Sequence, residues 1–343
     1  MSSERFVASM KKIALAGERE RKDLFEATAA KIKIRSDAVE KDFWICYAID
    51  HLFNESSFKD LFVFKGGTSL SKAYRAIERF SEDIDLILDW RKVIGEDVDP
   101  TIARSRTKQD QFNKKINSQA ALFYRETFVP ILEQELKKKL GKSQTVSIDS
   151  NDPMVVNFYY PQLFDVDYIR PVVRLEIGPL AEWTPSHIAQ ITPFVAEQYP
   201  ELFECKATKA LTIDIERTFW EKITILHKIA NFPDNKALPA RYARHLYDVY
   251  CMGNSSIKER AFSRKELLER DVAFKLKFYY AKSARYESAS LENVSLMPNP
   301  CILDSLRADY KSMENMIYGR TPSFEQILDF LSVLEREIHE LVD

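Results

Sequence analysis

The sequence predicts an α/β (α+β) fold in which a mixed sheet with flanking helices is followed by a C-terminal helical domain. Two observations favour this class. Short apolar or alternating segments are interspersed with longer helical patterns up to about residue 211, an order typical of a sheet covered by helices. From residue 212 onward the apolar spacing is helical to the end. We therefore expect a helical extension at 1–36, an α/β domain at 37–211 and a helical domain at 212–343.

The expected helices follow from apolar residues that recur three and four positions apart. In the segment 36–54, for example, Phe43 and Ile49 belong to one apolar face. The polar stretch 89–108 instead predicts a loop. Helices are expected at 4–32, 36–54, 69–78 and about 109–140.

Strands are predicted where apolar residues alternate with polar ones or form short uninterrupted runs. In the segment VVRLEIG, the side chains of Val173, Leu175 and Ile177 fall on one face. Strands are expected at 61–65, 83–88, 144–149, 154–160 and 170–177, with a last β segment near 204–210.

Composition and charge describe an ordinary soluble globular protein. Hydrophobic residues make up 45% of the chain and charged residues 30%, the usual proportions of a globular protein, and the length of 343 residues suggests two domains. The 50 basic and 52 acidic residues nearly balance, so a nucleic-acid partner requires a local basic patch. We find no secretory h-region and no apolar run of about 18 residues, and the four cysteines are widely scattered with no C-x-x-C spacing. We therefore expect a cytoplasmic protein with no membrane partner, disulfide framework or zinc site.

The segment FKGGTSLSKAYRAIERFSEDIDLIL at 64–88 carries the clearest functional pattern. Alternation along the second strand places Asp83 and Asp85 on one face, with Ile84 and Leu86 on the other. Two adjacent buried carboxylates repel each other, and a cation between them removes the repulsion. We expect Mg²⁺ or Mn²⁺, because hard cations bind carboxylate and phosphate oxygens together.

A glycine pair precedes these aspartates and suits a phosphate group. Gly66 and Gly67 let backbone N–H groups approach an anion closely, and Thr68 and Ser69 add hydroxyl donors. A lone D-x-D is usually a solvated strand face, and a lone Gly-Gly is usually a turn. Their order here, separated by one helix, favours a site for a metal ion and a phosphate. No G-x-x-x-x-G-K-[ST] motif of the Walker A type occurs.

The pattern GGTSL…RFSEDIDL resembles the first motif of the nucleotidyltransferase fold superfamily. Its form is similar to that of the AbiEii/AbiGii family of toxins, which are relatives of the MenT toxins. Two later blocks, ERTFWEKITILHK at 216–228 and RYARHLYDVY at 241–250, resemble that family's motifs with a functional helical lysine and a downstream aspartate. The resemblance covers about residues 37–252 in the same order and implies the nucleotidyltransferase fold for the α/β domain.

The resemblance also implies a function. A metal-dependent nucleotidyltransferase would transfer NMP from an NTP to an acceptor hydroxyl, which would be the 3′ end of a tRNA. The enzyme would then be the toxin of an AbiE-like (type IV) toxin–antitoxin or abortive-infection system for phage defence. Its antitoxin would be encoded separately and need not contact this chain. Two alternatives stay open: an acceptor hydroxyl on a small molecule or protein, and an NTP-binding regulatory protein without transfer activity.

A third carboxylate is expected, by resemblance to the nucleotidyltransferase fold, on a strand beside the aspartate pair. Glu176 is the candidate because it shares a strand face with Arg174. The exposed face of an edge strand would explain the same pattern. Glu176 would either help to deprotonate the attacking hydroxyl or bind a second metal ion. A further D-x-D, Asp165 and Asp167, follows a segment that contains a proline and is interpreted as a turn.

Lys222 and Asp248 are the candidates in the helical domain. The resemblance implies that Lys222 clamps the triphosphate and that Asp248 orients Lys222 or an arginine. Without it, Lys222 would be interpreted as a surface lysine and Asp248 as part of a structural salt bridge. The predicted catalytic residues are Asp83, Asp85, Glu176, Lys222 and Asp248, and the predicted metal ligands are Asp83, Asp85 and Glu176. The predicted nucleotide-binding residues are Gly66, Gly67, Thr68, Ser69, Lys72, Ser81, Lys222, Arg241 and Arg244.

Two basic runs permit an RNA partner without establishing one. They consist of Arg104, Arg106, Lys108, Lys114 and Lys115, and of Lys137, Lys138, Lys139 and Lys142. Runs of this kind are usually solvated helix faces, although phosphate binding requires similar charges.

Overall fold

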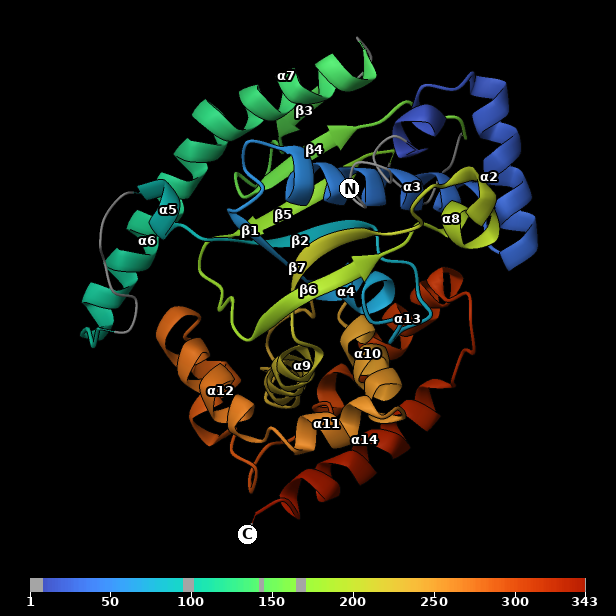
Figure 1. Ribbon diagram of the computed structural model, residues 1–343. Helices are drawn as coiled ribbons and strands as arrows, with labels where there is room; N and C mark the ends of the chain where they lie inside the picture. Colours follow the sequence, from blue (N-terminus) through green and yellow to red (C-terminus); the bar gives the residue numbers. More distant parts are fainter. Residues whose placement is uncertain (1–8, 95–101, 142–144, 165–170, 343) are drawn as a thin grey trace. The chain divides into compact units, whose positions relative to one another are not determined.

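The computed structural model describes residues 9–94, 102–141, 145–164 and 171–342 (Figure 1). Two compact units divide the chain: Met1–Ala73 with Phe80–Ile213, and Tyr74–Arg79 with Asp214–Asp343. We call them the sheet unit and the helical unit. The α/β class predicted from the sequence is confirmed. Within the described ranges, no helix combines the length and apolar character needed to cross a membrane.

The sheet unit is built on a mixed sheet that has seven strands in the described residues. In chain order they are β1 (Phe62–Lys65), β2 (Asp83–Leu88), β3 (Thr145–Ile148), β4 (Val155–Tyr159), β5 (Val173–Gly178), β6 (Ser186–Ile191) and β7 (Thr208–Ile213). Their spatial order is β3-β4-β5-β2-β1-β7-β6. β2 pairs antiparallel with β1 and parallel with β5, and β1 pairs parallel with β7. β1 and β2 therefore lie in the interior of the sheet, with a paired neighbour on each side.

One face of β1 and β2 forms the core beneath helix α3 (Ser36–Asp50). The side chains of Phe64, Ile84 and Leu86 are fully buried there, and each contributes about 1.5–3 kcal/mol relative to an exposed position. α3 packs against β2, β5 and β7, and Figure 1 shows it alongside the sheet. α3 continues into a π-helical turn, η1 (His51–Glu55). The expected helix 36–54 is thus confirmed, and the aspartates of β2 point away from it.

Further helices flank the sheet. α6 (Arg106–Phe123), η2 (Tyr124–Phe128) and α7 (Val129–Leu140) follow one another without a break and confirm the expected long helix. α7 packs against β3, and it buries Leu132, Leu136 and Leu140 at intervals of four residues. α2 (Glu18–Ile32) packs on α3, and α8 (Phe194–Gln198) contacts both helices.

Three expectations about the elements of this unit are wrong. Helix α4 (Gly66–Lys72) begins at the glycine pair and ends before residue 78, because Arg75 adopts a left-handed backbone with φ of 52°. The last β segment lies at 208–213 instead of 204–210. β6 was not expected, because this edge strand buries only Ala189 and Ile191 and its alternation is weak.

The expected loop at 89–108 is only partly described. α5 (Arg91–Ile94) and the beginning of α6 are helical, so helices occupy both ends of the segment. Residues 95–101, like residues 1–8 of the expected N-terminal helices, lie outside the described residues.

The helical unit is organised around α9 (Ile215–Ala230). α10 (Ala243–Gly253), α11 (Ile257–Phe262) and α12 (Glu266–Phe278) pack against α9, and α13 (Leu303–Met313) and α14 (Phe324–His339) pack against α10. The indole of Trp220 is fully buried, and its Nε1 donates to the Ala261 carbonyl at 3.0 Å. A capping box of Ser323 and Gln326 starts α14. The helical periodicity expected beyond residue 212 is confirmed.

Candidate active site

Four charged side chains share one face of the neighbouring strands β2 and β5. The parallel register places Asp83 beside Arg174 and Asp85 beside Glu176, and side chains of register partners point to the same side of a sheet. Arg174 Nε lies 3.9 Å from Asp83 Oδ1, and Arg174 Nη2 lies 3.5 Å from Glu176 Oε1. The Glu176 side chain is 40% exposed and that of Asp83 18%. The predicted carboxylates therefore gather on a polar, accessible face with an arginine among them.

β1 adds a lysine on the other side of the aspartate strand. Lys65 is the register partner of Asp85 and is half-buried. Sequence reasoning missed this residue, although it directly precedes the glycine pair and alternates with buried Phe64. Asp85 thus lies on a strand with a cationic residue on each neighbouring strand, Lys65 on β1 and Arg174 on β5, an arrangement that favours anionic ligands.

The glycine turn packs directly on Asp85. Gly66 has a φ of +77°, and a Cβ built at this position would lie 1.9 Å from Asp85 Oδ2. Any other L-residue would therefore be strained in its backbone and would displace the carboxylate. Gly67 follows as the second residue of α4. The glycine requirement is thus tied to the position of a predicted catalytic group.

The hydroxyls after the glycines are used within the turn. Thr68 Oγ1 donates to the Asp83 carbonyl, and Ser69 Oγ donates to the Gly66 carbonyl at 2.8 Å. Both side chains are buried, at 1% and 0% exposure. The Thr68 bond connects the start of α4 to β2, and the Ser69 bond closes the first turn of α4 itself.

Two buried ion pairs link α3 to the segment around the aspartates. Lys72 Nζ lies 2.6 Å from Asp42 Oδ1 and 3.9 Å from the centre of the Phe194 ring. Lys41 Nζ lies 3.0 Å from Glu82 Oε2. The ammonium of Lys72 is therefore already paired within the sheet unit. Ser81, next to Glu82 in the chain, is half-buried.

The donor chemistry of β2 fits a hard divalent cation. Asp83 and Asp85 offer carboxylate oxygens from the same strand face, and Mg²⁺ and Mn²⁺ prefer oxygen ligands. Within the described residues, however, no three His, Cys, Asp or Glu side chains lie close enough together to hold a metal ion. The charged group that lies near the Glu176 carboxylate is the guanidinium of Arg174, 3.5 Å away. The aspartate pair thus suits a cation, and the ligand role of Glu176 stays a prediction.

In the helical unit, Lys222 of α9 and Asp248 of α10 form a buried ion pair. Lys222 Nζ lies 2.8 Å from Asp248 Oδ2. Arg79 binds the same carboxylate at two points, with Nε 2.7 Å from Oδ1 and Nη2 2.9 Å from Oδ2. Asp248 is 0% exposed, and Arg79 only 4%. The predicted residues Lys222 and Asp248 are therefore in direct contact, and Arg79 binds the same Asp248 carboxylate.

The electrostatics of this cluster favour an anion. Burial alone would raise the pKa of the Asp248 carboxyl, but Arg79 and Lys222 hold it below its ordinary value. Burial lowers the pKa of Lys222 and, more strongly, that of His245. Neutral His245 can then accept a hydrogen bond at Nδ1 from Lys222 Nζ, 3.0 Å away. With Lys222 protonated, two cations face one carboxylate, and an anionic group would balance the excess.

The two predicted arginines of this region differ in position. Arg244 is half-buried and lies near the cluster. Its charge therefore helps to lower the pKa of both Lys222 and His245. Arg241 is exposed, with a φ of 66°. Its backbone N–H donates to Asp309 Oδ1 at 2.8 Å, which anchors the turn before α10.

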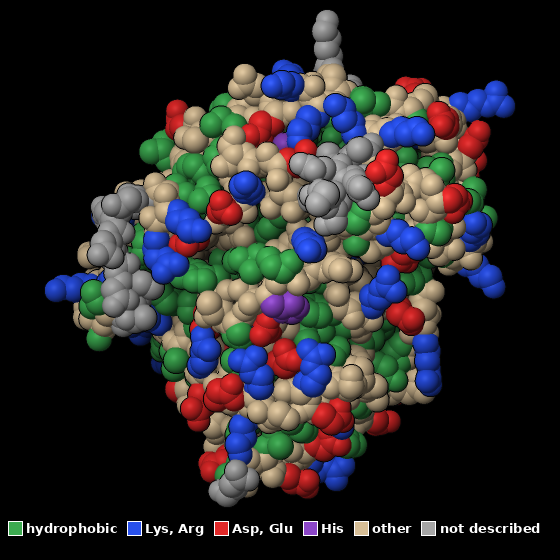
Figure 2. Space-filling model, in the orientation of Figure 1, with side chains coloured by type: hydrophobic (Ala, Val, Ile, Leu, Met, Phe, Trp, Pro, Cys, Tyr) green, Lys and Arg blue, Asp and Glu red, His purple; other side chains and the backbone are tan. Residues whose placement is uncertain are grey.

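The two basic runs carry acidic partners. Lys114 pairs with Asp110 at 2.8 Å, Lys137 with Glu133 at 3.1 Å and Lys139 with Glu55 at 2.5 Å. Figure 2 shows lysine and arginine side chains interspersed with acidic ones over the visible face. These runs therefore match solvated helix faces. Lys142, and with it Asp165 and Asp167, lies outside the described residues.

Comparison with known proteins gives a family match. A family model described as the nucleotidyl transferase AbiEii toxin of a type IV toxin–antitoxin system matches residues 48–330. Among solved structures, the chain is similar to MenT4, a nucleotidyltransferase toxin from Mycobacterium tuberculosis H37Rv. The identity is 15% and the TM-score 0.41, over 92% of this chain and 97% of the other. No curated protein matches the sequence.

Proposed function

The chain belongs to the AbiEii family of nucleotidyl transferase toxins of type IV toxin–antitoxin systems, and we propose that it transfers NMP from an NTP to the 3′ end of a tRNA. The family supports nucleotidyltransferase activity, an NTP substrate and a cognate antitoxin. The tRNA acceptor, the cofactor and the roles of individual residues are our proposals.

The placement of Asp83 and Asp85 supports the proposal most directly. They lie on one face of an interior strand, with Glu176 beside Asp85 on β5 and Gly66 packed against the Asp85 carboxylate. A divalent cation, Mg²⁺ or Mn²⁺, would be held by Asp83 and Asp85 and would neutralise charge on the phosphates. Positioning and charge neutralisation account for most of the catalysis of phosphoryl transfer.

The reaction breaks one phosphoanhydride bond and forms one phosphodiester bond. The acceptor hydroxyl oxygen bonds to the α-phosphorus while the bond from that phosphorus to the β-phosphate bridging oxygen breaks, and pyrophosphate leaves. We assign the hydroxyl proton to Glu176, whose side chain is more exposed than that of Asp83. Arg174 then stabilises the ionised form of Glu176 before the proton arrives.

The glycine turn and Lys222 each suit a phosphate group of the NTP. We propose that the backbone at Gly66 and Gly67 approaches the phosphates and that Lys222 clamps the triphosphate. Lys222 suits this role because it lies in a cluster with excess positive charge. Asp248 would orient its ammonium. Thr68, Ser69, Lys72, Ser81, Arg241 and Arg244 stay predictions for nucleotide binding.

The acceptor can be identified by label transfer. The purified protein is incubated with total RNA, each of the four α-phosphate-labelled NTPs in turn, and Mg²⁺ or Mn²⁺. We expect one labelled product that runs with tRNA and is destroyed by ribonuclease. A labelled product that resists ribonuclease would replace tRNA with a small-molecule or protein acceptor. Because NTP and tRNA are both cytoplasmic, we propose that the toxin acts there.

A further inference from the structure

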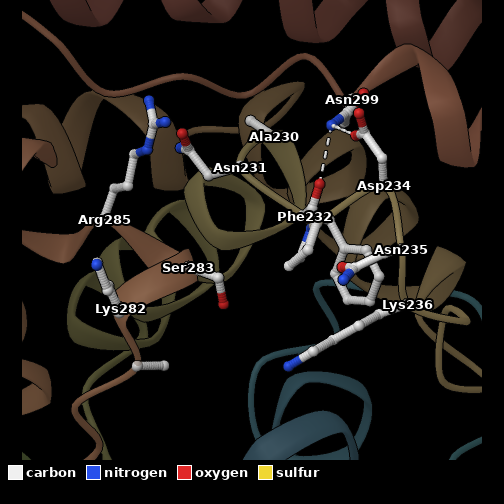
Figure 3. Close-up of a pocket in the computed structure, with 12 residues that line it drawn as sticks. Ala230, Asn231, Phe232, Asp234, Asn235, Lys236, Lys282, Ser283, Arg285 and Asn299 are labelled. Atoms are coloured by element: carbon white, nitrogen blue, oxygen red, sulfur yellow. Dashed lines mark hydrogen bonds between the residues drawn. The ribbon is translucent and has the colours of Figure 1, made fainter.

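The helical unit contains a wide cavity that lies outside the predicted site residues. Its volume is about 940 Å³, and it is lined by the segment Ala230–Lys236, by Ala281, Lys282, Ser283 and Arg285 of a second segment, and by Asn299. Figure 3 shows Lys282 and Arg285 on one side of the cavity and Lys236 on the other. This volume is at the upper end of the range for ligand pockets.

The walls of the cavity are fixed by hydrogen bonds. Asn299 Nδ2 donates to the Phe232 carbonyl at 2.8 Å and to Asp234 Oδ1 at 3.0 Å. Asn231 Nδ2 donates to the His227 carbonyl at 2.9 Å. His227 Nε2 lies 3.0 Å from the Arg285 carbonyl, which ties the second segment to α9. The cavity is therefore a built feature of this unit.

Cations predominate on the lining. Lys236, Lys282 and Arg285 are exposed, and within the described part of the chain none of the three side chains forms an ion pair. The acid on the lining, Asp234, already accepts a hydrogen bond from Asn299. Three cations without acidic partners around one cavity favour a ligand with several negative charges.

The remaining groups fit the bases of a nucleic acid. Asn235 adds an exposed amide that can donate to and accept from a base edge. Tyr279 and Tyr280 directly precede the second lining segment and are 50% and 41% exposed. Exposed aromatic rings can serve as stacking platforms for the bases of single-stranded nucleic acid, although these two tyrosines adjoin the lining in the chain and are not lining residues.

We propose that this cavity binds a single-stranded segment of the RNA acceptor, with Lys236, Lys282 and Arg285 on its phosphates. This inference rests on the proposed function for the identity of the acceptor, because the chemistry of the cavity specifies only a single-stranded polynucleotide. It assigns an acceptor-binding role to residues that lie outside the glycine–aspartate block and the Lys222 cluster.

The test measures RNA binding without NTP, so that it is independent of transfer. A short fluorescein-labelled single-stranded RNA is titrated with the full-length protein, and its anisotropy is followed at several salt concentrations. The test variant is Lys236→Ala/Lys282→Ala. Arg285 is left unchanged, because it has a φ of 48° and its carbonyl contacts His227, so a substitution there would also disturb the backbone. The matched control, Lys258→Ala/Lys311→Ala, removes the same charge elsewhere in the helical unit.

We expect the test variant to bind the RNA at least about tenfold more weakly than the wild type. The slope of log K against log salt should fall by about 1.4, since each lost phosphate contact on a single strand contributes about 0.7. The control should bind like the wild type, and both variants should keep the thermal midpoint and the KM for NTP. Equal RNA affinity in the two variants would overturn the inference. Failure of the proposed function has a different signature, which is the absence of label transfer in the wild type.

Discussion

Arg79 and Asp248, 169 residues apart in the sequence, form a buried two-point ion pair with distances of 2.7 and 2.9 Å. Arg79 belongs to the motif RFSEDIDL and precedes Asp83 by four residues in the chain. The same carboxylate receives Lys222 at 2.8 Å. Within the helical unit, Arg79 of the first motif and Lys222 of the lysine motif therefore both contact the carboxylate of Asp248.

Asp248→Asn should destabilise the protein strongly. The substitution keeps the shape of the side chain but leaves Arg79 and Lys222 buried without a counter-charge, so the free energy of unfolding should fall by about 3–5 kcal/mol. Urea unfolding measures this change. Glu325→Gln is the matched control, because its partner Arg307 lies on the surface and the loss should be below about 1 kcal/mol. Equal losses in the two variants would contradict the buried-cluster account.

Lys222→Ala should weaken NTP binding with little effect on folding. Asp248 keeps its two-point contact with Arg79 in this variant, so the carboxylate is not left unpaired. Loss of a charge-assisted hydrogen bond to phosphate should raise the KM for NTP about 10- to 100-fold. Lys228→Ala removes a half-buried lysine from the same helix and should leave the KM unchanged. An unchanged KM in Lys222→Ala would remove this residue from the NTP site.

Gly66→Ala should abolish most of the transfer activity. The new methyl group would lie 1.9 Å from Asp85 Oδ2 in a backbone with φ of +77°, so the carboxylate must move. A displacement of about 1 Å at a reacting centre costs about 100-fold in rate. Gly178→Ala is the control, since a Cβ at this end of β5 meets nothing within 4 Å. The rates of both variants are compared by label transfer, and equal rates would show that Asp85 does not need its observed position.

Glu40 should make stability depend on pH. Burial raises the pKa of its carboxyl to about 7 from 4.5, so between these values the folded state holds more protons than the unfolded state. The free energy of unfolding should therefore fall as pH rises from about 4.5 to about 7, by about 3 kcal/mol for this group. Glu40→Gln should remove the Glu40 part of this slope and stabilise the protein at pH 8, while buried Asp50, whose pKa is also raised to about 7, keeps its own part. Unfolding in urea across this pH range measures both slopes, and identical slopes would contradict the assignment.

The parts of the fold that the sequence predicted depend on local periodicity. Alternation in DIDLIL placed Asp83 and Asp85 opposite Ile84, and the structure buries Ile84 completely. β6 was missed because its pattern is weak, with Ile188 59% exposed on an edge strand. The end of α4 was missed because the left-handed conformation of Arg75 is not marked by a glycine or an asparagine.

Partnerships between distant residues could not be predicted from one sequence. The contacts of Lys41 with Glu82 and of Lys72 with Asp42 depend on how α3 packs on the sheet. In the same way, nothing local to the motif RFSEDIDL indicates that Arg79 pairs with Asp248. Lys65 is an intermediate case. Alternation along β1 predicts which face of the sheet its side chain lies on, but only the register between β1 and β2 shows that it lies beside Asp85.

The central claim is that Asp83 and Asp85 carry the transfer chemistry, and label transfer from an α-phosphate-labelled NTP to tRNA tests it most directly. Asp83→Asn and Asp85→Asn keep the size of the side chain, and Asp89→Asn is the control because Asp89 pairs with Arg91 beyond the end of β2. We predict that both test variants lose at least about 100-fold in rate while their thermal midpoints and the activity of Asp89→Asn stay at wild-type values. Transfer at the wild-type rate by folded Asp83→Asn and Asp85→Asn would contradict the account.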